Sequence, residues 1–268
     1  MSAKVRCIGG GNIVRAILAG VEKGGAFSNS EIGVFDISET VRAEFSAKGY
    51  EVYESIGQLV SGAPVVLMAV TPQVIGSVIE EVKGAFHKDT VILSVVAGIT
   101  NQWYQEHLGM DCKVVRCMPT LTAQVGMGAF AVSHTDSVSE EGYKKVEKFL
   151  GSCGILEEIP EKLMTEVVAF NGSAPGYFYH MTRVIVEEAV RLGFERETAI
   201  RLFAQTMKGS AQTILDSGMS VETLEGKLRL PGGTTVAALE KMEELGFDSC
   251  LSEGVKACVD RCIELGKL

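Results

Sequence analysis

The chain has 268 residues, enough for one large domain or two ordinary ones, and its 46% hydrophobic and 22% charged residues are typical of a globular protein. Its formal net charge of −9 argues against a nucleic-acid surface, because binding to phosphate backbones requires clustered lysine and arginine. No apolar run is long enough to span a bilayer and the N-terminus shows no signal-peptide pattern, so we expect a cytoplasmic protein with no membrane partner.

The start of the chain predicts a dinucleotide site. Residues 5–8 are a short β-prone run, three glycines follow, and apolar residues then recur at helical spacing. Gly9 permits a sharp turn, Gly11 leaves no Cβ in the way of a pyrophosphate, and the new helix offers free N–H groups to the phosphates. Val14 fills the third small position of this motif, so a glycine-rich turn that serves only packing is the alternative interpretation.

A second strand over residues 31–36 indicates which cofactor is bound. It ends in Asp36, at about the distance expected for an acid that hydrogen-bonds a ribose 2′-hydroxyl. Because a carboxylate repels a 2′-phosphate, and no Arg or Lys follows before Arg42, the sequence favours NADH over NADPH. The loop could still present Ser38 or let Arg42 fold back. Ser38 also predicts the cap of a helix over residues 38–48.

Strand-like and helix-like segments alternate up to about residue 160, which predicts βαβ units and a mainly parallel sheet. The expected strands lie at residues 51–53, 64–70, 90–96, 113–117, 128–133 and 154–157, and the expected helices at 55–61, 73–84, 101–108 and 139–150, with a flexible stretch before Gly126. We therefore predict an α/β fold, with a Rossmann-type doubly wound sheet in a dinucleotide-binding domain over residues 1–160. Ligands of such sheets bind at the carboxyl ends of the strands.

A second domain is predicted over residues 161–268. Apolar residues recur there at helical spacing, through residues 161–192, 195–216, 234–245 and 247–266. Pro175 interrupts the first of these stretches, so we expect a broken or kinked helix at that point. The glycine and serine beside it indicate close approach of the backbone to a ligand or a partner helix.

The segment Leu230-Pro-Gly-Gly-Thr-Thr235 is a second candidate site. A glycine turn feeds a helix that Thr234 or Thr235 could cap, so several N–H groups and a hydroxyl converge on one point. In an acidic protein this is a credible carboxylate site. An ordinary capped helix start is an equally good interpretation of the spacing alone.

The seven cysteines predict reduced thiols rather than disulfides. Their number is odd, the sequence has no C-x-x-C motif, and most of them lie in apolar stretches. Cys258 and Cys262 are four residues apart on an expected helix, yet no histidine is near them in sequence. We therefore expect them to pack in a core or an interface and predict no metal site.

Several short motifs occur in a characteristic order along the chain. They are Ile8-Gly-Gly-Gly-Asn12 with Ala16-Ile17, Ala69-Val70 with Pro72-Gln73, Ser94 with Ala97-Gly98-Ile99, Arg116 with Met118-Pro119, Gly172-Ser173 with Pro175, and Pro231-Gly-Gly-Thr-Thr235. Through them the chain resembles the pyrroline-5-carboxylate reductase family nearly end to end. The resemblance implies a Rossmann domain followed by an all-α dimerisation domain, and a homodimer that can assemble further into a ring of dimers.

The resemblance also implies an activity, hydride transfer from NADPH or NADH to the imine carbon of Δ1-pyrroline-5-carboxylate, which gives L-proline. Addition to a protonated imine depends on proximity and charge complementarity more than on an acid, consistent with the absence of paired carboxylates or a Ser-His-Asp pattern. With Asp36, the implied cofactor-binding residues are Gly9, Gly10, Gly11, Asn12, Ile13, Val70, Thr71, Pro72, Ala97, Gly98, Met118 and Pro119. The implied substrate-binding residues are Gly232, Gly233, Thr234 and Thr235, where Thr235 is the catalytic residue that bonds the ring nitrogen and backbone amides hold the carboxylate.

Some positions depart from the family pattern. Thr71 replaces the usual lysine, Thr120 the usual asparagine, Leu230 the usual serine, and Ala174 and Gly176 stand where glycine and alanine are usual. The first three line the region where cofactor or substrate would lie. Two alternatives therefore remain, a paralogous reductase of another cyclic imino acid and a non-catalytic nucleotide-binding regulator.

Overall fold

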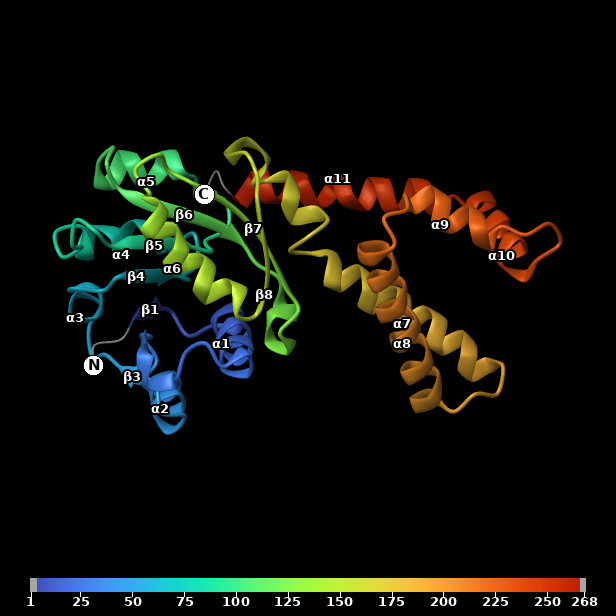
Figure 1. Cartoon of the computed structure of the whole chain (residues 1–268), viewed down its shortest axis with the longest axis horizontal. Coiled ribbons are helices and arrows are strands. Elements are labelled where there is room, and N and C mark those ends of the chain that lie inside the picture. The colour runs from blue at the N-terminus through green and yellow to red at the C-terminus, as the bar shows by residue number, and fades with distance from the viewer. Residues whose placement is uncertain (1–3, 266–268) are drawn as a thin grey trace. The chain divides into compact units, whose positions relative to one another are not determined.

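The structure is a computed structural model that describes residues 4–265. These residues form two compact units (Figure 1). Unit 1 comprises the described residues up to Pro175 together with those from Cys258 onwards, and unit 2 comprises Gly176–Ala257. The domain boundary between residues 160 and 161 stays a prediction.

In the described residues of unit 1, eight strands form one sheet in the order β3-β2-β1-β4-β5-β6-β7-β8 (Figure 1). The strands are β1 (Val5–Ile8), β2 (Ile32–Phe35), β3 (Glu51–Val52), β4 (Val65–Met68), β5 (Val91–Ser94), β6 (Lys113–Met118), β7 (Gly128–His134) and β8 (Gly154–Glu158). The β6–β7 pair is antiparallel and the other described pairs are parallel. The mainly parallel Rossmann-type sheet is thus confirmed.

The direction of β7 follows from the short connection that precedes it. A parallel crossover needs about a dozen residues or more, and the link between β6 and β7 is shorter than that. Part of this link, which the sequence indicated as flexible, is the 3₁₀ helix η2 (Leu121–Val125). The chain therefore turns back beside β6 and runs antiparallel to it.

Helices cover both faces of the sheet. One core cluster joins the strands to α1 (Asn12–Gly24), α2 (Glu39–Ala47) and α6 (Glu140–Gly151), and the other joins them to α3 (Ile56–Val60), α4 (Ile75–Val82) and α5 (Asn101–Leu108). Along β1, Val5 and Cys7 belong to the first cluster and Ile8 to the second, because successive strand residues point to opposite faces. Burial on both faces explains the unbroken apolar runs in the sequence.

Close packing along α1 depends on two glycines that the motif analysis did not single out. A Cβ on Gly20 would lie 2.0 Å from the carbonyl oxygen of Ala123, and one on Gly24 would lie 1.9 Å from that of Ser152. Val14, the departure from the glycine motif, is fully buried in the core. Gly20 and Gly24 are therefore the small residues that let α1 approach its neighbours, and they lie further along the helix than Val14.

From Ala174 onwards the described chain forms five α-helices: α7 (Ala174–Arg191), α8 (Arg196–Asp216), α9 (Val221–Leu228), α10 (Thr234–Glu244) and α11 (Phe247–Leu265). The all-α nature of this region is confirmed. The short helix α9 was not predicted, although Ser220 caps it, with its Oγ accepting from Thr223 N at 3.2 Å.

The predicted helical stretch over residues 161–192, broken or kinked at Pro175, is an α-helix only in its second part. Residues 161–173 contain two 3₁₀ turns, η3 (Glu161–Leu163) and η4 (Glu166–Ala169), and α7 begins at Ala174. Pro175 therefore lies in the first turn of α7 and does not interrupt a helix. A proline fits there because the first N–H groups of a helix have no intrahelical partner.

All seven cysteines lie within residues 4–265, and each of them is a free thiol. Burial raises the pKa of Cys7 to about 12 and also raises the pKa of Cys117, so both remain protonated near neutral pH. In this part of the chain, no group of three or more histidine, cysteine or acidic side chains is placed to hold a metal ion. Within the same residues, none of the helices has the length and apolar character needed to cross a bilayer.

Candidate functional site

The carboxyl ends of the central strands of unit 1 lie side by side. Ile8, at the end of β1, is in register with Phe35 of β2 and with Met68 of β4. Backbone hydrogen bonds continue beyond the strands, from Gly9 N to Phe35 O at 2.8 Å and from Ala69 N to Ile8 O at 3.0 Å. The strand order changes direction between β1 and β4, which is where sheets of this type bind their ligands.

Unit 1 brings all the predicted cofactor-binding residues to this edge of the sheet. Gly9, Gly10, Gly11, Asn12 and Ile13 follow β1, Asp36 follows β2, Val70, Thr71 and Pro72 follow β4, Ala97 and Gly98 follow β5, Met118 ends β6 and Pro119 follows it. The edge thus gathers segments from five strands that are far apart in the sequence. Their individual roles in cofactor binding stay predictions.

The glycine turn has the geometry that a pyrophosphate site requires. Gly9 has a φ of +100°, and a Cβ there would lie 2.5 Å from the carbonyl oxygen of Ala69. Gly11 is the N-cap of α1, and a Cβ on it would meet no heavy atom of the described chain within 4 Å. Within residues 4–265, no side chain caps α1 and its first turn contains no acid. Its free N–H groups therefore face an open position suited to an anion.

Asp36 is fixed beside this turn by two backbone groups. Its Oδ2 accepts from Gly10 N at 2.8 Å and its Oδ1 accepts from Ser38 N at 2.9 Å. The side chain is half-buried, and each carboxylate oxygen can accept a further hydrogen bond. The acid thus lies where a ribose hydroxyl could donate to it.

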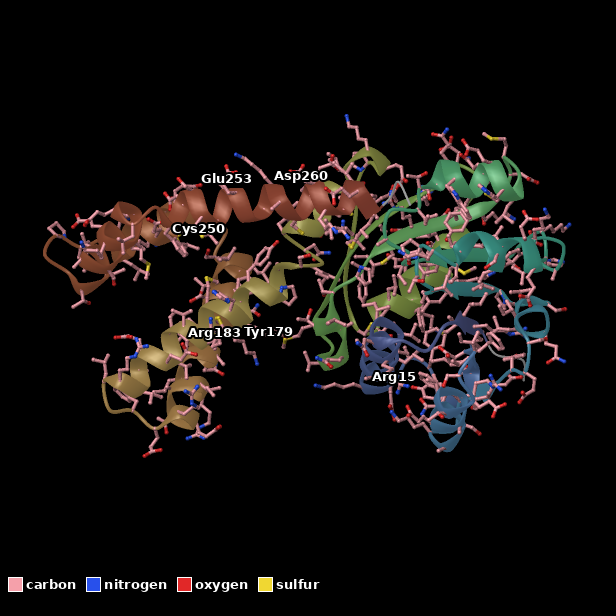
Figure 2. All side chains as sticks on the ribbon, turned by 180° about the vertical axis from the view of Figure 1, so that it is seen from behind. Arg15, Tyr179, Arg183, Cys250, Glu253 and Asp260 are labelled. Atoms are coloured by element: carbon pink, nitrogen blue, oxygen red, sulfur yellow. The ribbon has the colours of Figure 1, made fainter. Side chains whose placement is uncertain are left out.

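The two arginines nearest the turn are already engaged. Arg42 folds back, as the sequence allowed, and its Nη1 donates to Asp36 O at 2.7 Å while its Nη2 lies 3.7 Å from a carboxylate oxygen of Glu54. Its side chain is 15% exposed. Arg15, on α1 (Figure 2), pairs with Glu44 at 2.7 Å. The positive charges near the ribose end are therefore balanced by carbonyl and carboxylate groups.

The turn at the end of β6 is held by side chains that sequence reasoning did not single out. The amide of Asn171 donates from Nδ2 to Met118 O at 3.1 Å and to Ala129 O at 3.2 Å. Thr120 is buried, and its Oγ1 accepts from Ala129 N at 2.9 Å. Thr120, one of the departures from the family pattern, thus has a structural role in this turn.

A buried ion pair supports the loop after β5. Arg116 is 3% exposed, and its Nη1 lies 2.9 Å from Oε1 of Glu161. The same carboxylate accepts from Asn101 N at 3.0 Å and from Asn101 Nδ2 at 3.1 Å, at the N-terminus of α5. Because α5 begins just after Gly98, the pair fixes the end of the loop. The signal in the sequence was an arginine inside an apolar strand, which needs a partner when buried.

The predicted substrate-binding residues Gly232, Gly233, Thr234 and Thr235 lie in unit 2, at the start of α10. Gly233 N donates to Leu230 O at 2.8 Å, which closes the turn. The predicted threonine cap was wrong, because Gly233 is the N-cap and both threonines are inside the helix. Thr235 is exposed, so its hydroxyl and the first N–H groups of α10 are accessible to a ligand.

Comparisons with protein-family models find matches in both parts of the chain. A model described as pyrroline-5-carboxylate reductase dimerisation matches residues 161–265. A model described as NADP oxidoreductase coenzyme F420-dependent matches residues 4–98. Together the two matches account for the first part of the dinucleotide fold, from β1 to β5, and for the helical region.

Known relatives match over the full length. The pyrroline-5-carboxylate reductase of Escherichia coli is 31% identical over 268 residues, and that of Synechocystis is 32% identical over 269 residues, each with 100% of both chains covered. A solved structure of Plasmodium falciparum pyrroline carboxylate reductase with NADP bound superposes with a TM-score of 0.89, at 26% identity over 98% of each chain. The pyrroline-5-carboxylate reductase of Coxiella burnetii gives a TM-score of 0.87 at 28% identity over 98% of each chain.

Proposed function

Because the chain belongs to the pyrroline-5-carboxylate reductase family, we propose that it reduces Δ1-pyrroline-5-carboxylate to L-proline, using a nicotinamide cofactor. The observation that carries this proposal is the full-length similarity to reductases of that name, at 31% and 32% identity. The open glycine turn at the carboxyl edge of the sheet supports it, since a dinucleotide needs free N–H groups beside a position without side-chain atoms.

Each group of residues has a role in this proposal. When bound, the cofactor supplies the hydride. The N-terminus of α1 would hold the pyrophosphate, Asp36 would accept from the ribose, and the loops at Ala97–Gly98 and Met118–Pro119 would border the nicotinamide. In unit 2, the first N–H groups of α10 hold the substrate carboxylate. Thr235 bonds the ring nitrogen and orients the imine for hydride transfer.

Thr235→Ala tests the substrate role. We expect kcat/KM for the imine to fall by about 5- to 150-fold, equivalent to about 1–3 kcal/mol for one lost hydrogen bond to a charged group. The affinity for NADH alone should stay within about 2-fold, measured by fluorescence titration without substrate. Thr223→Ala, which removes a threonine hydroxyl from α9 in the same unit, is the control. Wild-type kinetics in the Thr235 variant would remove this residue from the site.

Leu230 motivates a second candidate, a reductase of another cyclic imino acid. It is 65% exposed and directly precedes the substrate turn, where the family usually has serine. The purified protein should be assayed with Δ1-pyrroline-5-carboxylate and with a six-membered cyclic imino acid, each with NADH and NADPH. Preference for the first substrate supports proline synthesis, preference for the second supports the paralogue, and cofactor binding without turnover identifies a regulator.

The proposed cofactor is NADH, and NADPH is the competing choice. The Plasmodium structure has NADP bound, and one matching family model is described as an NADP oxidoreductase. In this chain, however, the Asp36 carboxylate is held beside the glycine turn, and Arg42 faces the backbone and Glu54. A 2′-phosphate at this point would meet a fixed negative charge and an arginine that is already paired.

Asp36→Ala is expected to weaken NADH more than NADPH. Loss of hydrogen bonds to a carboxylate should reduce NADH affinity by about 10- to 100-fold, while NADPH gains from the removed repulsion. The quantity to measure is the ratio of the two dissociation constants. Loosening of the loop affects both cofactors alike, so it cancels in that ratio. An unchanged ratio would contradict the role given to Asp36.

We also propose a homodimer, which assembles further into a ring of dimers. Many large apolar side chains of unit 2 are exposed, including Tyr179 on α7 at 62% (Figure 2) and Leu202 on α8 at 60%. An apolar hollow of about 650 Å³ lies between α7 and α11, where it is lined by Val184 and Leu251. Exposed apolar surface of this extent is typical of an interface. Sedimentation velocity would distinguish monomer, dimer and ring.

A cytoplasmic location is the last part of the proposal. Seven free thiols in residues 4–265 are typical of a reducing compartment, because oxidising compartments favour disulfides. Proline synthesis also requires a supply of reduced nicotinamide cofactor. Fractionation of the cells that make the protein would test the location.

A further inference from the structure

Asn171 occupies an unusual position between the end of one strand and the start of the next. The side-chain amide has two N–H groups, and it donates to Met118 O at 3.1 Å and to Ala129 O at 3.2 Å. Met118 ends β6 and Ala129 lies near the start of the antiparallel strand β7. One side chain therefore bridges the two sides of the connection that contains Met118–Pro119.

The backbone around Asn171 is anchored as well. Asn171 N donates to Val167 O at 2.9 Å, and Asn171 O accepts from Ala174 N at 3.3 Å. The next residue, Gly172, is so close to Met118 that a Cβ on it would lie 3.1 Å from the Met118 sulfur. The side chain that holds the Met118 carbonyl is thus fixed to the segment between η4 and the start of α7.

We propose that Asn171 is a positioning residue for the nicotinamide end of the cofactor site. Its two hydrogen bonds set the place of the Met118 carbonyl and so of the Met118–Pro119 turn, which would border the nicotinamide ring. This inference depends on the proposed function, because it takes that turn as a wall of the cofactor site. Asn171 itself touches neither the substrate nor the reacting atoms, and it acts through the turn.

The expected effect of losing these hydrogen bonds is on the rate more than on the fold. Single hydrogen bonds contribute little to the net stability of a domain, so the protein remains folded without these two. Hydride transfer is more sensitive, because a shift of about 1 Å in a positioning group can lower a rate by roughly 100-fold. A loosened turn should therefore lower kcat while the distant adenosine end stays as it was.

Asn171→Asp tests this with almost no change in shape. A carboxylate cannot donate, and the oxygen that replaces Nδ2 would face both carbonyl oxygens, so both hydrogen bonds are lost. We expect kcat to fall at least about 10-fold and NADH affinity to fall by a few-fold. Affinity for ADP-ribose, which lacks the nicotinamide, should stay within about 2-fold of wild type. Asn171→Ala, which adds no charge, should give the same pattern and replaces the aspartate variant if that one fails to fold.

Asn29→Asp is the matched control. Asn29 also donates from Nδ2 to a backbone carbonyl, that of Lys48 at 2.7 Å, but it lies next to α2 and away from the β6 turn. The kcat of the Asn29→Asp variant should stay within about 2-fold of wild type, since surface substitutions of this kind have small effects. If Asn171 had only a structural role, its variants would lose affinity for ADP-ribose and for NADH equally, or would keep the wild-type kcat while folded. Either result overturns the inference.

The same measurements separate this inference from the proposed function. If the wild-type protein binds neither NADH nor ADP-ribose, the cofactor site itself is wrongly assigned and the inference falls with it. If the wild type binds both and turns over the imine, while the Asn171 variants match it in kcat and in both affinities, the cofactor site stands and the role of Asn171 alone is rejected.

Discussion

Gly9→Ala is expected to lower the free energy of unfolding by about 2–4 kcal/mol and to abolish dinucleotide binding. The physical reason is local, because Gly9 has a φ of +100° and a Cβ there would lie 2.5 Å from the carbonyl oxygen of Ala69. Either the turn or the end of β4 has to move, and both border the proposed cofactor site. Urea unfolding and NADH titration of the purified variant check the two effects.

Gly11→Ala is the matched control for that prediction, because it should affect the ligand alone. Gly11 has a φ of −71°, which alanine adopts without strain, and a Cβ there would have no heavy atom of the described chain within 4 Å. The free energy of unfolding should change by less than about 0.5 kcal/mol. NADH affinity should nevertheless fall at least about 10-fold, because the methyl group takes the place of the pyrophosphate. Wild-type affinity in this variant would place the phosphates elsewhere.

Glu161→Gln is expected to cost about 2–3 kcal/mol of the free energy of unfolding. Breaking a buried ion pair typically costs about 3–5 kcal/mol, and the lower figure allows for the one-third exposure of Glu161. The remaining partner, Arg116, is 3% exposed and would keep its charge without a counterion. Because the same carboxylate accepts from Asn101 at the start of α5, the loop that contains Gly98 should also loosen. Urea unfolding measures the first effect and NADH affinity the second.

Glu141→Gln provides the comparison for this buried pair. Lys145 Nζ lies 3.0 Å from Glu141 Oε1, a distance close to that of the buried pair, but the two side chains are 42% and 84% exposed. An exposed pair contributes about 0–1 kcal/mol, so this variant should unfold almost like wild type. In the double variant with Arg116→Met and Glu161→Met, no unpaired charge remains, and it should be more stable than Glu161→Gln alone. Equal costs for the two single variants would contradict the importance of burial.

Features that depend on neighbouring residues could be predicted from the sequence. The glycine turn at Gly9 and the strand ending in Asp36 are local patterns, and burial on both faces gives a parallel strand its unbroken apolar run. The Ser38 cap was also predictable, since its Oγ accepts from Val41 N three residues away. The fold and the candidate cofactor-binding edge can therefore be predicted from short segments of the sequence taken one at a time.

Contacts between distant residues could not be predicted in this way. Asn171 and Met118 are 53 residues apart in sequence, and Arg116 and Glu161 are 45 apart. The buried arginine signalled the need for a partner but did not identify Glu161. Pro175 was misplaced for a different reason, because a proline inside a helical pattern is compatible with a break or with a helix start. The 3₁₀ turns η3 and η4, which precede Pro175, are too short to give a recognisable repeating pattern in the sequence.

Unit 1 is formed by two separate stretches of the chain, which limits how the enzyme can be divided into fragments. Its residues are not contiguous, since the last turns of α11 belong with the sheet and not with the helices that precede them. Cys258 Sγ donates to Ser173 Oγ at 3.3 Å, and Cys262 is 6% exposed. A fragment that stops at Pro175 would expose surface that these turns cover. Any exchange of the nucleotide-binding half between related reductases therefore has to carry the end of the chain with it.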